Sequence, residues 1–243
     1  VKQINVVGLF ARLILAFGAV GSLIFIGFAT GVVRTYLREH GFRLDQTNKG
    51  FRRRRGLLTL TDVVMPTHRV QAAVVQTGPI RKRRGWHSLK FVSLAQDSKE
   101  ESNFVAAPFA TLSEVWRIAQ AATFAPPDGD ERLQRGAAKY WFTQLLVIVP
   151  VVLAGMAALV VFADAAVGRT IVLLLLLVLP GALFWLDWRQ YRFGLDDHQL
   201  YLERGWWQQQ LTIAPKVKVQ SIEIAQGPLA RRQGLASLRF GIA

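Results

Sequence analysis

The chain has 243 residues and no cysteine, which excludes disulfide bonds and thiolate metal sites. Its formal net charge is +14, yet 51% of its residues are hydrophobic and its mean hydropathy is positive. The apolar and basic residues must therefore lie in separate segments. Since the chain starts at Val1 rather than at a methionine, we expect it to be a piece of a longer protein.

The first segment, residues 13–33, is apolar and uncharged. It has the length of about 20 residues that a helix needs to span a bilayer. Gly27 and Gly31 have the spacing that lets helices approach closely in lipid, although glycines that are merely tolerated in a lipid-facing helix explain them equally well. The pattern predicts one transmembrane helix with its flank over residues 1–38.

From residue 42 onward, short β-type runs alternate with turn residues. Strands are predicted over 42–45, 51–55, 57–65, 70–76 and 89–94. A capping box, Thr111-x-x-Glu114, then begins an amphipathic helix. Several strands followed by one helix indicate a small α+β domain over residues 39–124, and we expect the helix to lay Trp116 on the sheet.

A linker over residues 125–139 leads to two further apolar runs, 141–162 and 170–186. Only a short polar segment separates these runs, which predicts an antiparallel transmembrane hairpin within residues 140–189. Pro150 and Pro180 are compatible with such helices, because neighbouring groups in lipid satisfy the freed carbonyls. Strand patterns resume over 192–195, 199–204, 209–213, 217–225 and 238–242, predicting a second, incomplete domain over residues 190–243.

An internal repeat relates the two predicted domains. Shifting residues 205–240 by 149 positions superimposes them on residues 56–91 without a gap. The shift matches Gly56 with Gly205 and Pro66 with Pro215, and the motif Gly78-Pro79 with Gly227-Pro228. A period near 150 residues is too long for a solenoid unit, so the repeats are two domains of one type.

The repeated motifs are Pro-x-x-x-Val-Gln, Gly-Pro-[Ile/Leu]-x-x-Arg and Gly-x-x-Ser-Leu-x-Phe. With them, the sequence resembles the bacterial pleckstrin-homology-like (PH-like) domains of YdbT-type multi-pass membrane proteins. The resemblance covers residues 42–123 and 191–243. It implies a membrane-attached protein whose domains are strongly bent antiparallel sheets, each closed by a C-terminal helix, with no catalytic residues to carry over. The sequence departs from the pattern where Arg53 aligns with the apolar Leu202.

Basic residues suggest how such a protein is oriented. Because the predicted hairpin returns the chain to the side it left, both domains lie on one side of the membrane. The excess of Lys and Arg on that side, including Arg34, Arg38 and Lys139 near the span ends, predicts a cytoplasmic location under the positive-inside rule.

Two basic clusters are the candidate binding site. They are Arg52, Arg53, Arg54 and Arg55, and Arg81, Lys82, Arg83 and Arg84. Beside an anionic inner leaflet each basic residue contributes about 1 kcal/mol, so we predict contact with anionic lipid. Two forms remain open: a pocket for one phosphorylated headgroup, and a diffuse basic face that follows the bilayer. The second repeat keeps only Arg231 and Arg232 of the loop cluster, so a headgroup site is expected in the first.

A further open point concerns Gln71 and Gln220, which lie at matching positions of strand-like runs and would bond either to edge backbone or to a partner strand.

Signatures of enzymes are absent from the sequence. Its four histidines, His40, His68, His87 and His198, are scattered, and no nucleotide-binding or hydrolase motif occurs. We therefore expect no catalytic residue, cofactor or metal. The prediction is a non-enzymatic membrane protein with cytoplasmic PH-like domains, serving as a lipid- or protein-binding scaffold in cell-envelope maintenance. Its expected partners are the anionic lipids of the inner leaflet and either another membrane protein or a second copy of the chain. An accessory subunit of a transport assembly and a nucleic-acid-binding membrane protein are the alternatives.

Overall fold

A computed structural model describes residues 6–93, 103–127, 133–140, 149–150, 152–157 and 179–242. The chain divides into two compact units, Val1–Val64 and Met65–Ala243.

The first unit begins with a long helix, α1 (Val6–Glu39). Its part Phe17–Glu39 is long and apolar enough to cross a membrane, and it is the one such helix in the described part of the chain. Side chains such as Ile24 and Phe28 on this helix are about two-thirds exposed or more. Length and composition thus agree with the first predicted span. The other two, 141–162 and 170–186, lie largely outside the described residues.

The helix leads into a three-stranded antiparallel sheet in the order β1 (Arg43–Thr47), β2 (Gly50–Arg55) and β3 (Thr61–Pro66). The turn between β2 and β3 depends on Gly56, whose φ is +115°. A Cβ atom there would overlap the carbonyl oxygen of Thr59, so no other residue fits. Gly205 plays the same part against Gln208 in the second repeat, which explains why the repeat retains both glycines.

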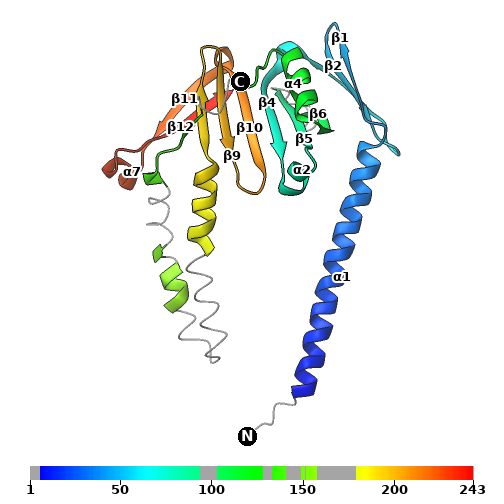
Figure 1. Ribbon diagram of the computed structural model, residues 1–243, viewed down its shortest axis with the longest axis vertical. Coiled ribbons are helices and arrows are strands. Elements are labelled where there is room, and N and C mark those ends of the chain that lie inside the picture. Colours follow the sequence, from blue (N-terminus) through cyan, green and yellow to red (C-terminus); the bar gives the residue numbers. More distant parts are fainter. Residues whose placement is uncertain are drawn as a thin grey trace. The chain divides into compact units, whose positions relative to one another are not determined.

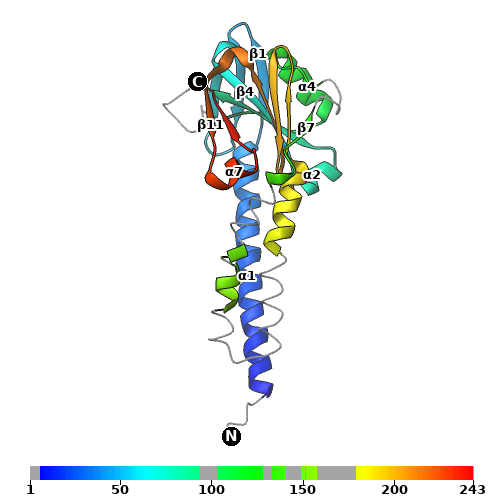
Figure 2. The same ribbon diagram turned by 90° about the vertical axis from the view of Figure 1, so that its left-hand side faces the viewer.

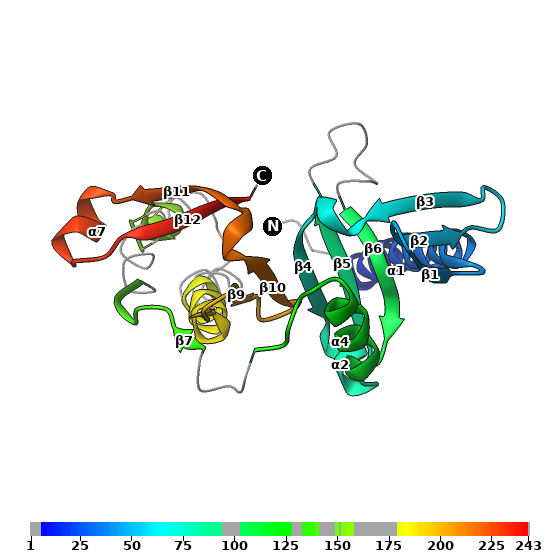
Figure 3. The ribbon, with the colours of Figure 1, turned by 90° about the horizontal axis from the view of Figure 1, so that it is seen from above.

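The second unit is built around a seven-stranded sheet whose strands come from both repeats. Its order is β6 (Asn103–Ala110), β5 (His87–Ser93), β4 (Val70–Thr77), β10 (Gln209–Pro215), β9 (Gln199–Arg204), β8 (Arg192–Leu195) and β7 (Gln134–Arg135). Figure 1 and Figure 3 show β4 and β10 side by side at its centre.

The two repeats meet where β4 pairs with β10. The strands are antiparallel, from Thr77 opposite Gln209 to Ala73 opposite Ile213. At the far end of this pair, Lys218 Nζ donates to the carbonyl oxygen of His68 at 3.0 Å. The predicted domain limits therefore do not coincide with the sheet, because one continuous sheet contains strands from both sides of the linker.

The predicted amphipathic helix is present as α4 (Leu112–Ala121), and its capping box is confirmed. Trp116, which we expected on the sheet, is partly buried, while Val115 and Ala119 are fully buried. Small residues allow the helix to lie close to β5 and β6. Behind them Phe91 stacks on Phe124, with 6.1 Å between the ring centroids.

The end of the second repeat forms a separate hairpin, β11 (Val219–Ala225) and β12 (Ser237–Ile242), joined through the short helix α7 (Pro228–Arg232). The three-residue turn η3 (Lys216–Lys218) connects it to β10, just as η1 (Thr67–Arg69) connects β3 to β4. Most residues of β11 are exposed, whereas nearly all of β4 is buried. The architecture is thus two β-rich repeats with antiparallel sheets and helices.

Candidate functional site

The first basic cluster lies on β2, where two of its side chains are held by one carboxylate. Arg52 Nη2 and Arg54 Nε lie 2.6 and 2.8 Å from Asp62 Oδ2 on β3. Hydrogen bonds from these two guanidinium groups hold the pKa of Asp62 well below its usual 3.8. The same pairing raises the pKa of Arg52. Much of the positive charge on this strand is therefore neutralised within the protein.

Burial removes the other two arginines of this cluster from the candidate lipid site. Arg53 has no exposed surface, and Arg55 is 6% exposed. Arg55 Nη1 donates to Glu39 Oε1 at 2.7 Å, joining β2 to the end of α1. A lipid headgroup could not reach Arg53 or Arg55 without opening the sheet, so their predicted role is corrected to a structural one.

The second basic cluster lies on and just after α2 (Pro79–Arg83). Gly78 and Pro79 begin this helical turn, and the amide of Trp86 closes it by donating to the carbonyl oxygen of Arg81 at 2.8 Å. Lys82, Arg83 and Arg84 are exposed. No described carboxylate forms an ion pair with the cluster, unlike the case on β2.

Aromatic rings hold two of these arginines in place. The guanidinium carbon of Arg81 lies 4.8 Å from the ring centroid of Phe109, and that of Arg84 lies 5.4 Å from Trp86. The two rings contact each other edge to face, at 5.9 Å. Each stacked guanidinium keeps its N–H groups free at the edges, where they can donate to an oxygen anion.

Residues of the second repeat lie beside the α2 cluster. Because Thr77 lies opposite Gln209, α2 follows β4 at the same end of the sheet at which the β9–β10 turn precedes β10. Lys82 Nζ donates to Gln209 Oε1 at 2.9 Å and links the two repeats there. The turn carries Trp206 and Trp207, which are 40% and 63% exposed.

We call these residues together the basic–aromatic surface. Its members are Ile80, Arg81, Lys82, Arg83, Arg84, Trp86, Phe109, Trp206 and Trp207.

The third apolar run reaches the sheet at this same end. Its described part is the helical segment 179–190, which passes directly into β8. Arg192 at the start of β8 lies opposite Glu203, near the end of β9, so the segment arrives beside the β9–β10 turn. Figure 1 and Figure 2 show α2 and this segment (yellow) at one end of the sheet. Trp188 Nε1 anchors the segment by donating to the carbonyl oxygen of Gly136 at 3.1 Å.

Sequence reasoning found the α2 cluster but missed its aromatic neighbours. Phe109 and the two tryptophans are distant in sequence and reach the cluster only through strand pairing. A signal for the tryptophans was nevertheless present in the repeat. Leu57 and Leu58 occupy the matching positions in the first repeat and are also exposed, so an apolar hairpin tip is common to both copies.

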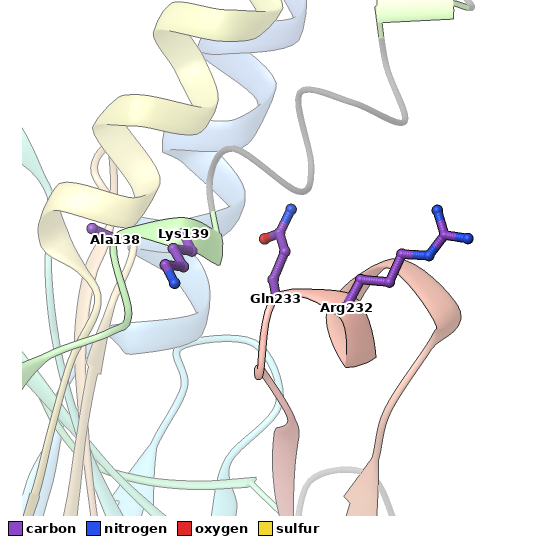
Figure 4. A pocket seen from close by; sticks show the side chains of 4 residues that line it. All are labelled: Ala138, Lys139, Arg232 and Gln233. Atoms are coloured by element: carbon purple, nitrogen blue, oxygen red, sulfur yellow. The ribbon is translucent and has the colours of Figure 1, made fainter.

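A shallow open depression elsewhere is lined by Ala138, Lys139, Arg232 and Gln233 (Figure 4). Arg232 points away from Lys139, so the two cations do not converge on a common point. Among the described residues, no group of three or more His, Cys, Asp or Glu side chains could hold a metal ion.

Comparison with known proteins identifies the family. The model of the bacterial PH domain matches twice, over residues 5–123 and 144–243, and so covers both repeats. No curated protein and no solved structure matches. The two matches cover most of the chain and confirm the resemblance, so this chain belongs to the bacterial PH domain family.

Proposed function

We propose that this chain is a non-enzymatic, multi-pass protein of the bacterial cell membrane whose PH-like repeats bind anionic lipid at the cytoplasmic leaflet. In this role it serves as a scaffold in cell-envelope maintenance. The observation that carries the proposal is the basic–aromatic surface, which lies at the end of the sheet where an apolar chain segment arrives.

Charge supports this assignment. Each Lys or Arg near an anionic leaflet contributes about 1 kcal/mol, and the effect falls off within roughly one Debye length. Arg83 and Arg84 are exposed at the sheet end, and neither forms an ion pair with a carboxylate in the part of the chain that is described. Their charge is therefore available to lipid phosphates.

The aromatic residues support the same partner. Tryptophan prefers the interface between headgroups and hydrocarbon, because its ring is apolar and its N–H is polar. Trp207 is 63% exposed at the hairpin tip, and Ile80 is 76% exposed on α2. In water such apolar exposure is unfavourable, whereas at a bilayer surface it adds to binding.

The test uses the whole chain in nanodiscs of neutral lipid, with and without added anionic phosphatidylglycerol. The absence of native cysteine permits a single probe at Ile80→Cys, labelled with a nitroxide to measure its depth. We expect deeper immersion in the anionic discs. The double variant Arg83→Gln, Arg84→Gln should weaken binding of the basic–aromatic surface to the anionic bilayer by about 2 kcal/mol. This corresponds to about a 30-fold drop in the ratio of membrane-bound to unbound surface.

The matched control removes two charges from the opposite end of the sheet, with Arg69→Gln and Lys216→Gln. These changes should leave the depth of the probe unaltered. Equal immersion in neutral and anionic discs would refute the proposal, as would equal effects of the two double variants. Displacement of the docked surface by a single-stranded oligonucleotide at physiological salt would favour nucleic-acid binding instead.

A further inference from the structure

The turn between β2 and β3 carries three exposed leucines, Leu57, Leu58 and Leu60, which we call the leucine tip. Their side chains are 50%, 81% and 71% exposed. Single exposed apolar residues are normal on a protein surface, whereas a group of them marks a contact site. The leucine tip belongs to the first unit and is not part of the basic–aromatic surface, so it needs a separate explanation.

Backbone hydrogen bonds hold the leucine tip at the end of α1. The amide of Gly56 donates to the carbonyl oxygen of His40, and the amide of Leu57 donates to that of Leu37, both at 2.9 Å. Figure 1 shows β2 reaching the end of α1, with the β1–β2 turn at the far end of the small sheet. The leucine tip therefore lies at the end of the sheet that is next to the helix.

The length of α1 gives the level of the leucine tip relative to a bilayer. The apolar run ends at Val33, and Leu37 follows four residues later. A helix rises 1.5 Å per residue, so Leu37 lies about 6 Å beyond the apolar run. The headgroup layer on each side of the hydrocarbon core is roughly 5–8 Å thick. If α1 spans the bilayer, the leucine tip is thus at the level of the headgroups.

The second repeat has the same arrangement with different residues. Trp206 and Trp207 occupy the positions that match the first two leucines of the tip. They too lie beside the end of an apolar helical segment, 179–190. Leucine and tryptophan differ in shape and hydrogen bonding but share a large apolar surface, so the property common to both turns is suited to an apolar partner.

We propose that the leucine tip inserts into the bilayer interface beside α1 and holds the first repeat against the membrane. Its partner is the apolar part of the lipid, which is the same whatever the headgroup charge. Because the tip is bonded to the helix, its insertion also fixes how far α1 emerges from the bilayer. The inference rests on the proposed membrane location and is independent of the proposed preference for anionic lipid.

A depth measurement on the whole chain in nanodiscs of neutral lipid tests the insertion. The chain has no native cysteine, so a nitroxide on Thr59→Cys reports from the leucine tip and leaves its three leucines in place. Asn48→Cys, in the β1–β2 turn, is the matched control, because the six residues of β2 separate the two turns by roughly 20 Å. Phe25→Cys, within α1, reports whether the helix is in the membrane.

We expect the Thr59 probe to collide several-fold less often with a water-soluble nickel complex than the Asn48 probe does, and more often with oxygen, which concentrates in lipid. Adding anionic phosphatidylglycerol should leave the depth of the Thr59 probe unchanged. This separates the leucine tip from the basic–aromatic surface, whose Ile80 probe should move deeper in the same discs.

Substitutions in the tip test whether the leucines cause the insertion. Leu58→Gln with Leu60→Gln should bring the nickel collision rate of the Thr59 probe to the level of the Asn48 probe. Leu58→Trp, which introduces the residue type of the second repeat, should keep the probe immersed. Both leucines are more than two-thirds exposed, so these changes leave the packing of the sheet intact.

Three results overturn the inference. Equal nickel collision rates at Thr59 and Asn48, with the Phe25 probe in hydrocarbon, would overturn it while the membrane location stands. Protection of the Thr59 probe from both nickel and oxygen would mean that protein, rather than lipid, covers the tip. A Phe25 probe that is accessible to nickel would refute the membrane location and the inference together.

The opposite combination is also informative. An immersed Thr59 probe, with an Ile80 probe that does not respond to anionic lipid, would support the inference and refute the proposed lipid preference.

Discussion

Arginines in the two basic clusters have opposite environments although the clusters look alike in sequence. On β2, Asp62 holds Arg52 and Arg54 at 2.6 and 2.8 Å. On and just after α2, Arg81 and Arg84 contact aromatic rings instead of carboxylates. A neutralised arginine contributes little to an anionic surface, whereas a stacked one keeps its full charge. The neighbours of each residue, rather than its type, decide which cluster can bind.

A second feature at the residue scale is the cap of α4. Thr111 N and Thr111 Oγ1 both donate to Glu114 Oε2 at 2.8 Å, and these bonds lower the pKa of Glu114 from its usual 4.5. Since the folded-state pKa is depressed, the stabilisation is complete above pH 4.5 and is lost as the pH falls through the folded-state pKa.

We therefore expect Thr111→Ala to lower the local stability of α4 by about 1 kcal/mol. Glu114→Gln should loosen α4 at neutral pH and have little effect in acid, where the wild-type carboxyl is also protonated. Hydrogen exchange of the α4 amides in the whole chain measures both effects. An equal effect of Glu114→Gln at neutral and acid pH would show that the charge of Glu114 does not contribute.

At the scale of elements, the junction between α1 and β2 depends on a buried ion pair. The side chains of Arg55 and Glu39 are 8% and 11% exposed and meet at 2.7 Å. Backbone bonds from Gly56 to His40 and from Leu57 to Leu37, both 2.9 Å, reinforce this junction. The end of the helix is thereby joined to the sheet through both side chains and backbone.

Arg55→Ala removes the more buried of the two arginines that hold Glu39, since Arg38 Nε also lies 2.8 Å from Glu39 Oε1. The loss should therefore be about 1.5–3 kcal/mol, the contribution of one hydrogen bond between charged groups. The neighbouring Arg54→Ala is the matched control. Its partner Asp62 is partly exposed, and such pairs contribute about 0–1 kcal/mol. Hydrogen exchange of β2 in the intact chain compares the two variants. Similar losses for both would contradict a special role for the buried pair, whereas recovery in Arg55→Met with Glu39→Leu would support it.

At the scale of the whole molecule, the proposed topology makes a prediction that is independent of lipid specificity. Single cysteines at Asn48 in the β1–β2 turn and Asp197 in the β8–β9 turn should be protected from a membrane-impermeant thiol reagent in intact cells. A cysteine at Gly168, between the second and third predicted spans, should react. Labelling of the cysteine at Asn48 or at Asp197 in unlysed cells would contradict the proposed cytoplasmic location of the repeats.

The sequence by itself determined the features that depend on neighbours along the chain. The repeat, the alternation of strands with turns, the capping box at Thr111 and the exposed cluster after Gly78 all follow from local spacing. Such signals survive in a linear sequence because the residues that cause them lie within one turn or one strand of each other.

Only the tertiary structure decided which strands meet. The β4–β10 ladder joins residues more than a hundred positions apart. The pattern of apolar and polar residues in either strand does not predict which other strand it pairs with. The same long-range pairing brings Trp206 and Trp207 to the end of the sheet that carries α2, and it makes a single sheet from two repeats. Packing likewise buried Arg53 and Arg55 in a run of four arginines, because the fold turns alternate side chains of a strand inward whatever their charge.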